Sequence, residues 1–107
     1  MPAARLSRLP RRAVLGIEVP VAVGARARLL GLSGLDREQA GAGLLIPRCS
    51  SVHTFGMRFA LDLAFLDRDG NLLATMRSVP PRRLAWQRGA VAVLELPHRR
   101  GESPPGL

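Results

Sequence analysis

The clearest pattern along the chain is an alternation of apolar and other side chains in the second half of the sequence. The apolar side chains recur at every second position: Met57, Phe59, Leu61, Leu63 and Phe65. A period of two predicts a β-strand over 52–66 with these side chains on one face. The Asp-Arg-Asp-Gly tetrad at 67–70 predicts a tight turn, because its final glycine accepts positive φ. Residues 71–79 should then return as the second strand of a hairpin.

Shorter apolar runs predict further strands on either side of this hairpin. We expect these strands at 14–23, 44–46 and 90–96. The first of them should lie near a sheet edge, because Pro20 has no N–H to donate to a strand ladder. Many short strands separated by glycine and proline are typical of sandwiches and barrels. The sequence therefore predicts a mainly β fold, a small β-sandwich or squashed barrel of five to six short strands with one short helix.

The segments between these strands are less regular. Residues 24–32 place two arginines beside three leucines, which fits the one short amphipathic helix. Residues 33–43 contain three glycines and should be mostly loop, with Asp36 as a possible helix cap. Residues 82–89 should form an exposed connection that carries the only tryptophan of the chain.

The two ends of the chain lack a periodic apolar pattern. Residues 1–12 carry four arginines, two prolines and no acid, so we expect a disordered basic arm. Residues 98–107 should be a disordered or atypical C-terminal tail. The part between them, 13–97, is long enough for a single β domain with one core.

Charge changes this picture little once it is divided along the sequence. The formal net charge is +8, but the first twelve residues supply +4 of it. Residues 13–97 contain ten arginines and seven acids, a net charge of only +3. A flexible basic arm can contact phosphates, yet aromatic side chains for base stacking are scarce. We therefore expect nucleic acid to be an improbable partner.

The cellular compartment can be predicted from the length of the apolar segments and from the cysteine content. No apolar run approaches the roughly 18 to 20 residues of a membrane span. Glu18 and Pro20 interrupt the stretch that a signal peptide would need to be apolar. Cys49 is the only cysteine, so no intramolecular disulfide can form. We expect a cytoplasmic protein.

Cys49 and His53 are the first candidates for chemistry. They are four residues apart, and Asp62 could in principle orient the imidazole as the third member of a nucleophilic triad. In one regular strand, however, His53 and Asp62 would lie on opposite faces. Only a bulge, for which Gly56 is suited, could bring them together. A packed or hydrogen-bonded cysteine and histidine is therefore the preferred interpretation, and a reactive thiol at Cys49 is the alternative.

Two acidic residues interrupt apolar strands. Asp62 and Glu95 must face water or find partners, because an unpaired buried carboxylate is costly. Arg58, Arg77 or Arg82 could pair with Asp62, and the two carboxylates could also line one cleft. The sequence contains no metal-binding or nucleotide-binding motif, so we expect no metal and no cofactor.

Several motifs between residues 28 and 96 form a specific combination. They are Arg-Leu-Leu-Gly-Leu at 28–32, Gly-Leu-Leu-Ile-Pro at 43–47, His-Thr-Phe-Gly-Met-Arg-Phe at 53–59, Leu-Asp at 61–62, Phe-Leu-Asp at 65–67, Asp-Gly at 69–70 and Leu-Glu-Leu at 94–96. With them the chain resembles the bacterial and archaeal domain of unknown function 192 (DUF192) family over roughly residues 13–97. The resemblance implies a compact β fold and no established activity.

The sequence departs from this family after Pro97. Family members usually continue through a turn to a Gly-Asp pair and a last short strand, which residues 98–107 do not match. An absent closing strand would leave a sheet edge open to pairing with another chain. The expected state is therefore a monomer or an edge-paired homodimer.

Three functions remain open at this stage. The favoured one is a non-enzymatic domain that binds a small polar ligand or a protein partner. Its expected ligand-binding residues are His53, Thr54, Met57, Asp62, Arg82 and Glu95, with Trp86 at the rim. The alternatives are a hydrolase-like enzyme that uses Cys49 and His53, and nucleic-acid or acidic-partner binding through the arginine arm.

Overall fold

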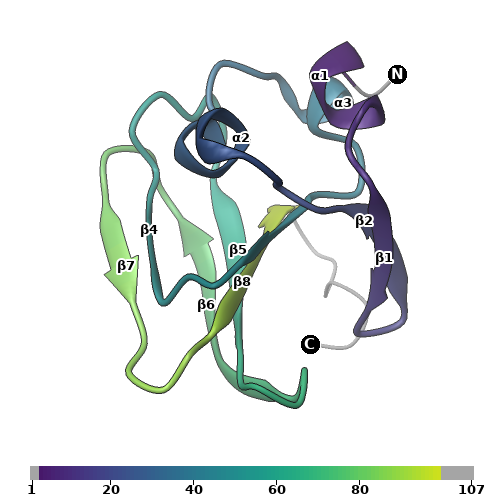
Figure 1. Ribbon diagram of the computed structural model, residues 1–107. Helices are drawn as coiled ribbons and strands as arrows, with labels where there is room; N and C mark the ends of the chain where they lie inside the picture. Colours follow the sequence, from purple (N-terminus) through teal and green to yellow (C-terminus); the bar gives the residue numbers. More distant parts are fainter. Residues whose placement is uncertain (1–2, 100–107) are drawn as a thin grey trace.

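A computed structural model of the chain describes residues 3–99, which form short strands and helices around a central sheet (Figure 1). The helices are α1 (Ala4–Ser7), α2 (Ala25–Leu30) and α3 (Arg37–Ala40). The strands are β1 (Arg11–Val14), β2 (Ile17–Pro20), β3 (Leu44–Pro47), β4 (Ser51–His53), β5 (Leu61–Leu66), β6 (Leu72–Val79), β7 (Leu84–Trp86) and β8 (Ala92–Pro97). The predicted mainly β class is confirmed, with more strands and helices than expected.

The strands pair in three antiparallel sheets. The central sheet has the order β3-β8-β5-β6, while β1 pairs with β2 and β4 pairs with β7. In the central sheet Glu95 is directly opposite Leu44 on one side and Leu63 on the other. Asp62 is opposite Leu96. This register decides which face of the sheet each side chain joins.

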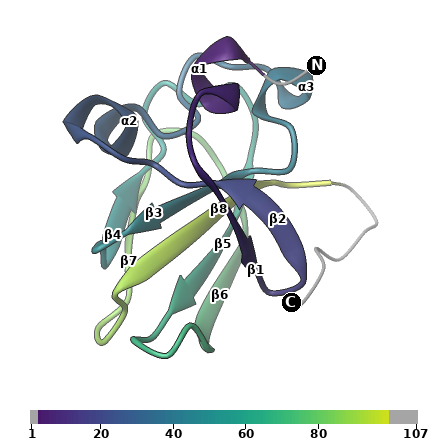
Figure 2. The same cartoon turned by 45° about the vertical axis from the view of Figure 1, so that its right-hand side comes forward.

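Both faces of the central sheet are covered (Figure 2). The three helices and the β4–β7 pair contribute to the larger apolar cluster, which includes Leu63, Phe65 and Val93. The β1–β2 hairpin contributes to the second cluster, which includes Ala64 and Leu94. Every residue of β5 is buried as a result. A strand buried on both faces has a nearly continuous apolar sequence, and Leu-Asp-Leu-Ala-Phe-Leu departs from it only at the aspartate.

The strand predicted over 52–66 is interrupted in the structure. The chain leaves β4 after His53 and enters β5 only at Leu61. Gly56 has a φ of +80° in the connection, a conformation that glycine adopts without strain. Met57 and Phe59 are nevertheless buried, as the alternation predicted for the odd positions. The even positions of β5 are buried as well, because the sheet is covered on both faces.

The segment 14–23 is also two strands rather than one. Leu15 and Gly16 have φ values of +51° and +82° and form the two-residue turn between β1 and β2. Such turns require positive φ at both central positions, and leucine there is not a recognisable turn signal. The predicted turn at 67–70 is confirmed, because the Gly70 N–H donates to the Asp67 carbonyl at 3.0 Å. The short helix at α2 and the Asp36 cap are confirmed as well.

Residues 3–12 differ from the disordered arm that the sequence suggested. Leu6 of α1 is 3% exposed and belongs to the larger apolar cluster. An Nη of Arg5 donates to the carbonyls of Gly31 at 3.2 Å and Ser33 at 2.6 Å. The basic composition of this segment therefore gave no indication that Leu6 is buried in the core or that Arg5 forms hydrogen bonds to the rest of the domain.

The remaining boundary predictions concern the connection at 82–89 and the C-terminus. Part of the former is β7, which pairs with β4. His98 and Arg99 are within the structure, whereas the prediction for 100–107 lies outside the described residues. No helix in the part of the chain from 3 to 99 is long and apolar enough to cross a membrane.

Packing of α1 can be tested with Leu6→Ala. We expect the substitution to lower the free energy of unfolding by about 2 kcal/mol or more, because it empties a buried position. Arg8→Ala, an exposed change in the same turn of chain, should alter it by less than about 0.5 kcal/mol. Equal urea midpoints for the two variants would mean that the N-terminal segment does not pack on the domain.

Candidate functional site

A pocket of about 210 Å³ lies between α2, β4 and β8 on the helix-covered side of the central sheet. Its polar lining residues are Arg28, Cys49, Ser51, His53 and Glu95. The apolar walls come mainly from leucines of α2, together with Ile46, Val52 and Met57. Three of the six predicted ligand-binding residues, His53, Met57 and Glu95, therefore share one pocket.

Glu95 is the most unusual of these residues. It lies in the middle of β8 and is 1% exposed. Burial raises the pKa of its carboxyl group to about 8, although a hydrogen bond from the Leu32 backbone acts in the opposite direction. Its Oε1 atom has no hydrogen-bond partner among residues 3–99. A buried carboxyl group with an unused oxygen is thus part of the pocket lining.

Gly31 explains how the carboxyl group fits against α2. A Cβ atom at this position would lie 2.7 Å from Glu95 Oε1, closer than real Cβ contacts. Gly31 also ends α2 with a φ of +53°. Glycine is therefore favoured here by the positive φ, and the absence of a Cβ atom leaves the space that Glu95 Oε1 occupies.

His53 also keeps one polar atom without a partner. Its Nε2 atom is 3.1 Å from the carbonyl oxygen of Leu29, which can only accept a hydrogen bond. Nε2 therefore carries a proton in this contact, and Nδ1 of the neutral ring is an acceptor. Nδ1 is buried and has no partner within the described part of the chain.

The other polar side chains of the pocket are engaged elsewhere. The Cys49 thiol donates to the Ser51 carbonyl at 2.8 Å. The Arg28 guanidinium donates to the carbonyls of Pro47 and Arg48. Among the hydrogen bonds of residues 3–99, none joins Cys49 to His53, whose Nε2 atom instead donates to the Leu29 carbonyl.

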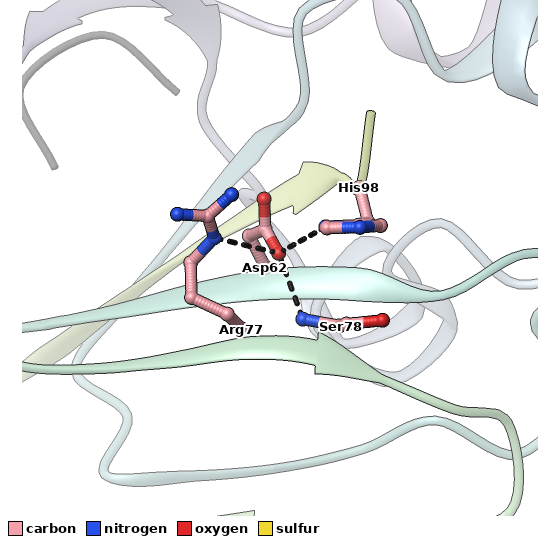
Figure 3. A network of polar contacts seen from close by, with 4 residues as sticks. All are labelled: Asp62, Arg77, Ser78 and His98. Carbon is pink, nitrogen blue, oxygen red and sulfur yellow. Dashed lines mark hydrogen bonds and ion pairs between the residues drawn. The ribbon is translucent and has the colours of Figure 1, made fainter. Parts of the chain in front are cut away.

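Asp62 lies in a separate network on the other face of the sheet (Figure 3). Its Oδ1 atom accepts hydrogen bonds from Ser78 N–H and His98 Nδ1, each at 2.8 Å, and Arg77 Nε is 3.3 Å away. Asp62 is 0% exposed. Arg77 is thus the ion-pair partner among the three arginines considered from the sequence, and His98, assigned there to the tail, is a second partner.

Asp62 and Glu95 do not line one cleft. The register places Asp62 opposite Leu96, on the face covered by the β1–β2 hairpin. Glu95 lies opposite Leu44 and belongs to the helix-covered face. The sheet itself separates the two carboxyl groups, so the idea of a paired carboxylate site is wrong.

The last two predicted ligand residues stand outside the pocket lining. Thr54 is 0% exposed, and its hydroxyl donates to the Pro80 carbonyl at 2.7 Å and accepts from Arg83 N–H at 2.8 Å. Arg82 is exposed, has a φ of +66°, and donates its backbone N–H to the Thr54 carbonyl. Both residues fasten the connection after β4 to the connection before β7. Within residues 3–99, no group of three or more His, Cys, Asp or Glu side chains could hold a metal ion.

Sequence reasoning did not place Arg28 and Gly31 at the site. Both belong to the Arg-Leu-Leu-Gly-Leu motif at 28–32, which was noticed as a pattern without an assigned role. A glycine that ends a short amphipathic helix was the available signal, since it allows close approach by another chain segment. Its partner, Glu95, is too distant in sequence to be inferred from spacing.

The Asp62 network can be tested with Asp62→Ala. We expect the free energy of unfolding to fall by about 3 kcal/mol or more, because the change leaves Ser78 N–H without its acceptor and removes the partner of His98. Asp69→Ala, at an exposed turn position, should cost less than about 0.5 kcal/mol. Urea unfolding of both variants measures the contrast, and similar losses would argue against a structural role for Asp62.

The Glu95 pKa predicts a pH dependence of stability. Between about pH 4.5 and pH 8 the folded protein keeps a proton on Glu95 that the unfolded chain releases. Stability from this group is therefore complete below pH 4.5 and is lost as the pH rises toward 8, by about 1.4 kcal/mol per pH unit. Relative to Glu95→Gln, the wild-type protein should lose about 2 to 3 kcal/mol between pH 5 and pH 7 in urea unfolding. Parallel pH profiles for the two proteins would contradict the raised pKa.

Comparisons with known proteins agree with the sequence resemblance. The chain is similar to a crystal structure of a protein of unknown function from Novosphingobium aromaticivorans, with a TM-score of 0.60 and 19% sequence identity. The match covers 74% of this chain and 61% of the other, so the chain spans less than two thirds of that protein's length. No curated protein matches the chain. The family model of DUF192, described as an uncharacterized ACR, matches residues 9–103, and the chain therefore belongs to the DUF192 family.

Proposed function

We propose that this protein is a non-enzymatic binding domain and that the pocket beside Glu95 holds a small polar ligand. One observation carries the proposal. Glu95 and His53 line the same pocket, and each has a buried side-chain atom without a hydrogen-bond partner among the described residues. A ligand with matching polar atoms would supply both partners.

The energetic argument rests on the usual satisfaction of buried polar groups. A buried donor or acceptor without a partner costs about 1 to 3 kcal/mol, and most such groups in folded proteins are hydrogen-bonded. Asp62 meets this requirement at Oδ1, which has three polar partners, although its Oδ2 has none among residues 3–99. Glu95 differs in that its carboxyl group has only the Leu32 backbone as a partner and lines a pocket. Unsatisfied groups in a largely apolar pocket are typical of a ligand site, where a few polar atoms fix orientation.

Binding accounts for these groups better than hydrolysis does. An acyl-transfer enzyme needs a nucleophile within hydrogen-bond reach of its base. Here the Cys49 thiol is held by Ser51 and the His53 ring by Leu29. The N-terminal arginines support nucleic-acid binding less than a free arm would, because Arg5 contacts two carbonyls and Arg11 pairs with Glu18.

Protein binding is the second candidate function. Two side chains of β7, Leu84 and Trp86, are 65% and 70% exposed. They are two residues apart in a strand and therefore point to the same side. Exposed aromatic and aliphatic side chains in one place favour contact with another protein.

Ligand binding can be tested by a thermal-unfolding screen against amines, amino acids, sugars and nucleotides. A compound that binds the folded protein should raise the unfolding midpoint, by several degrees at saturating concentration. The shift should disappear in His53→Ala and persist in Ser50→Ala, whose side chain lies next to the pocket segment but outside its lining. A ligand whose shift survives His53→Ala, or a cooperative protein that responds to no compound, would count against this pocket and favour the protein-binding function.

A further inference from the structure

The chemistry of the two unpartnered atoms restricts what the pocket can hold. In the neutral imidazole, His53 Nδ1 is an acceptor, because Nε2 carries the one ring proton toward the Leu29 carbonyl. An ionised Glu95 offers only acceptors, and Leu32 N–H already donates to its carboxyl group. With Glu95 ionised and the imidazole neutral, both groups are acceptors and are matched by hydrogen-bond donors from a ligand.

The charge of Glu95 has no counterion within residues 3–99. The nearest candidate in the pocket lining is Arg28, but its guanidinium donates to the carbonyls of Pro47 and Arg48. None of the ion pairs in this part of the chain includes Glu95. A buried carboxylate is stable only with a paired charge, and the protein does not provide one.

The apolar walls define the rest of the ligand. Leu29, Leu30 and Ile46 line the pocket together with Val52 and Met57. These side chains suit a short hydrocarbon portion attached to the donor group. The volume of about 210 Å³ limits the ligand to a small molecule.

We propose that the ligand is a small organic cation, an alkylguanidinium or alkylammonium, whose N–H groups bond to Glu95 Oε1 and His53 Nδ1 while its alkyl part contacts the apolar wall. This inference rests on the proposed binding function and adds the chemical class. It also explains why a carboxyl group is buried beside the pocket although no cationic side chain of the protein pairs with it. The ligand itself supplies the positive charge.

The proposal has a pH signature. A cation that binds only the ionised carboxylate displaces a proton from Glu95, whose pKa is about 8 before binding. Affinity should then rise with pH, by about fifty-fold between pH 6 and pH 8, as the ionised fraction grows. The other charged or titratable side chains in the pocket lining are Arg28, Cys49 and His53. The rise in affinity should disappear in Glu95→Gln, and a rise of the same size in that variant would contradict the role of Glu95.

Three matched probes test the class of ligand: ethylguanidinium, its neutral isostere N-ethylurea, and the anion propionate. Binding is followed by chemical-shift changes of pocket backbone amides at pH 6 and pH 8. Ethylguanidinium should bind, with the fifty-fold rise, while N-ethylurea and propionate bind at least tenfold more weakly at pH 8. Glu95→Gln should abolish the preference for the cation, whereas Asp69→Asn, a loss of charge on the exposed turn, should retain it.

The outcomes separate this inference from the proposed function. N-ethylurea binding as tightly as ethylguanidinium, or affinity that falls as the pH rises, would overturn the cation and leave a polar ligand site. Propionate binding in preference to both would overturn it as well. No shift of pocket amides with any probe would overturn the inference and weigh against the pocket itself. The pH series on the wild-type protein gives these answers even if Glu95→Gln does not fold.

Discussion

The burial of β5 and β8 on both faces is the constraint on which the rest of the structure depends. These strands are the two inner members of the central sheet, so each side chain must fit against either the helices or the β1–β2 hairpin. Apolar residues meet this requirement directly. Asp62 and Glu95 do not, and the fold has to accommodate one carboxyl group on each face.

The two carboxyl groups are accommodated in different ways. Asp62 is near the start of β5, where a backbone N–H, an imidazole and a guanidinium can reach its Oδ1. Glu95 is surrounded by apolar strands and α2, and its environment favours the protonated form. The first arrangement contributes to the integrity of the domain. The second leaves a buried carboxyl group with an unpartnered Oε1 atom in the lining of a pocket, and the proposed ligand site is argued from this difference.

Local patterns in the sequence predicted local structure and burial. The turn after β5, the helix α2, the cap at Asp36 and the burial of Met57 and Phe59 all follow from neighbouring residues. The β1–β2 turn was missed because leucine at positive φ gives no signal. Helix α1 was missed because it is only four residues long and lies in a segment, 1–12, that is rich in arginine and contains two prolines.

The site was predictable only in part, for a different reason. The sequence identified His53 and Glu95 as candidates, but their shared pocket depends on β4 and β8 approaching the same side of α2. Asp62 was as strong a candidate in the sequence as Glu95, but it lies on the opposite face of the sheet from the pocket. A shift of one residue in the strand register decides which face a side chain joins. Which side chains share a face depends on how distant strands pair, and residue spacing along the chain does not reveal that pairing.

The contact between Arg5 and the end of α2 has a consequence for the pocket. Its guanidinium holds the carbonyls of Gly31 and Ser33, and Gly31 is the residue against which the Glu95 carboxyl group rests. Helix α1 therefore holds the end of α2 in place beside the pocket, although none of the residues of α1 lines that pocket. Any displacement of the end of α2 must break these two hydrogen bonds, so the shape of the pocket wall is coupled to an N-terminal residue that does not line the pocket.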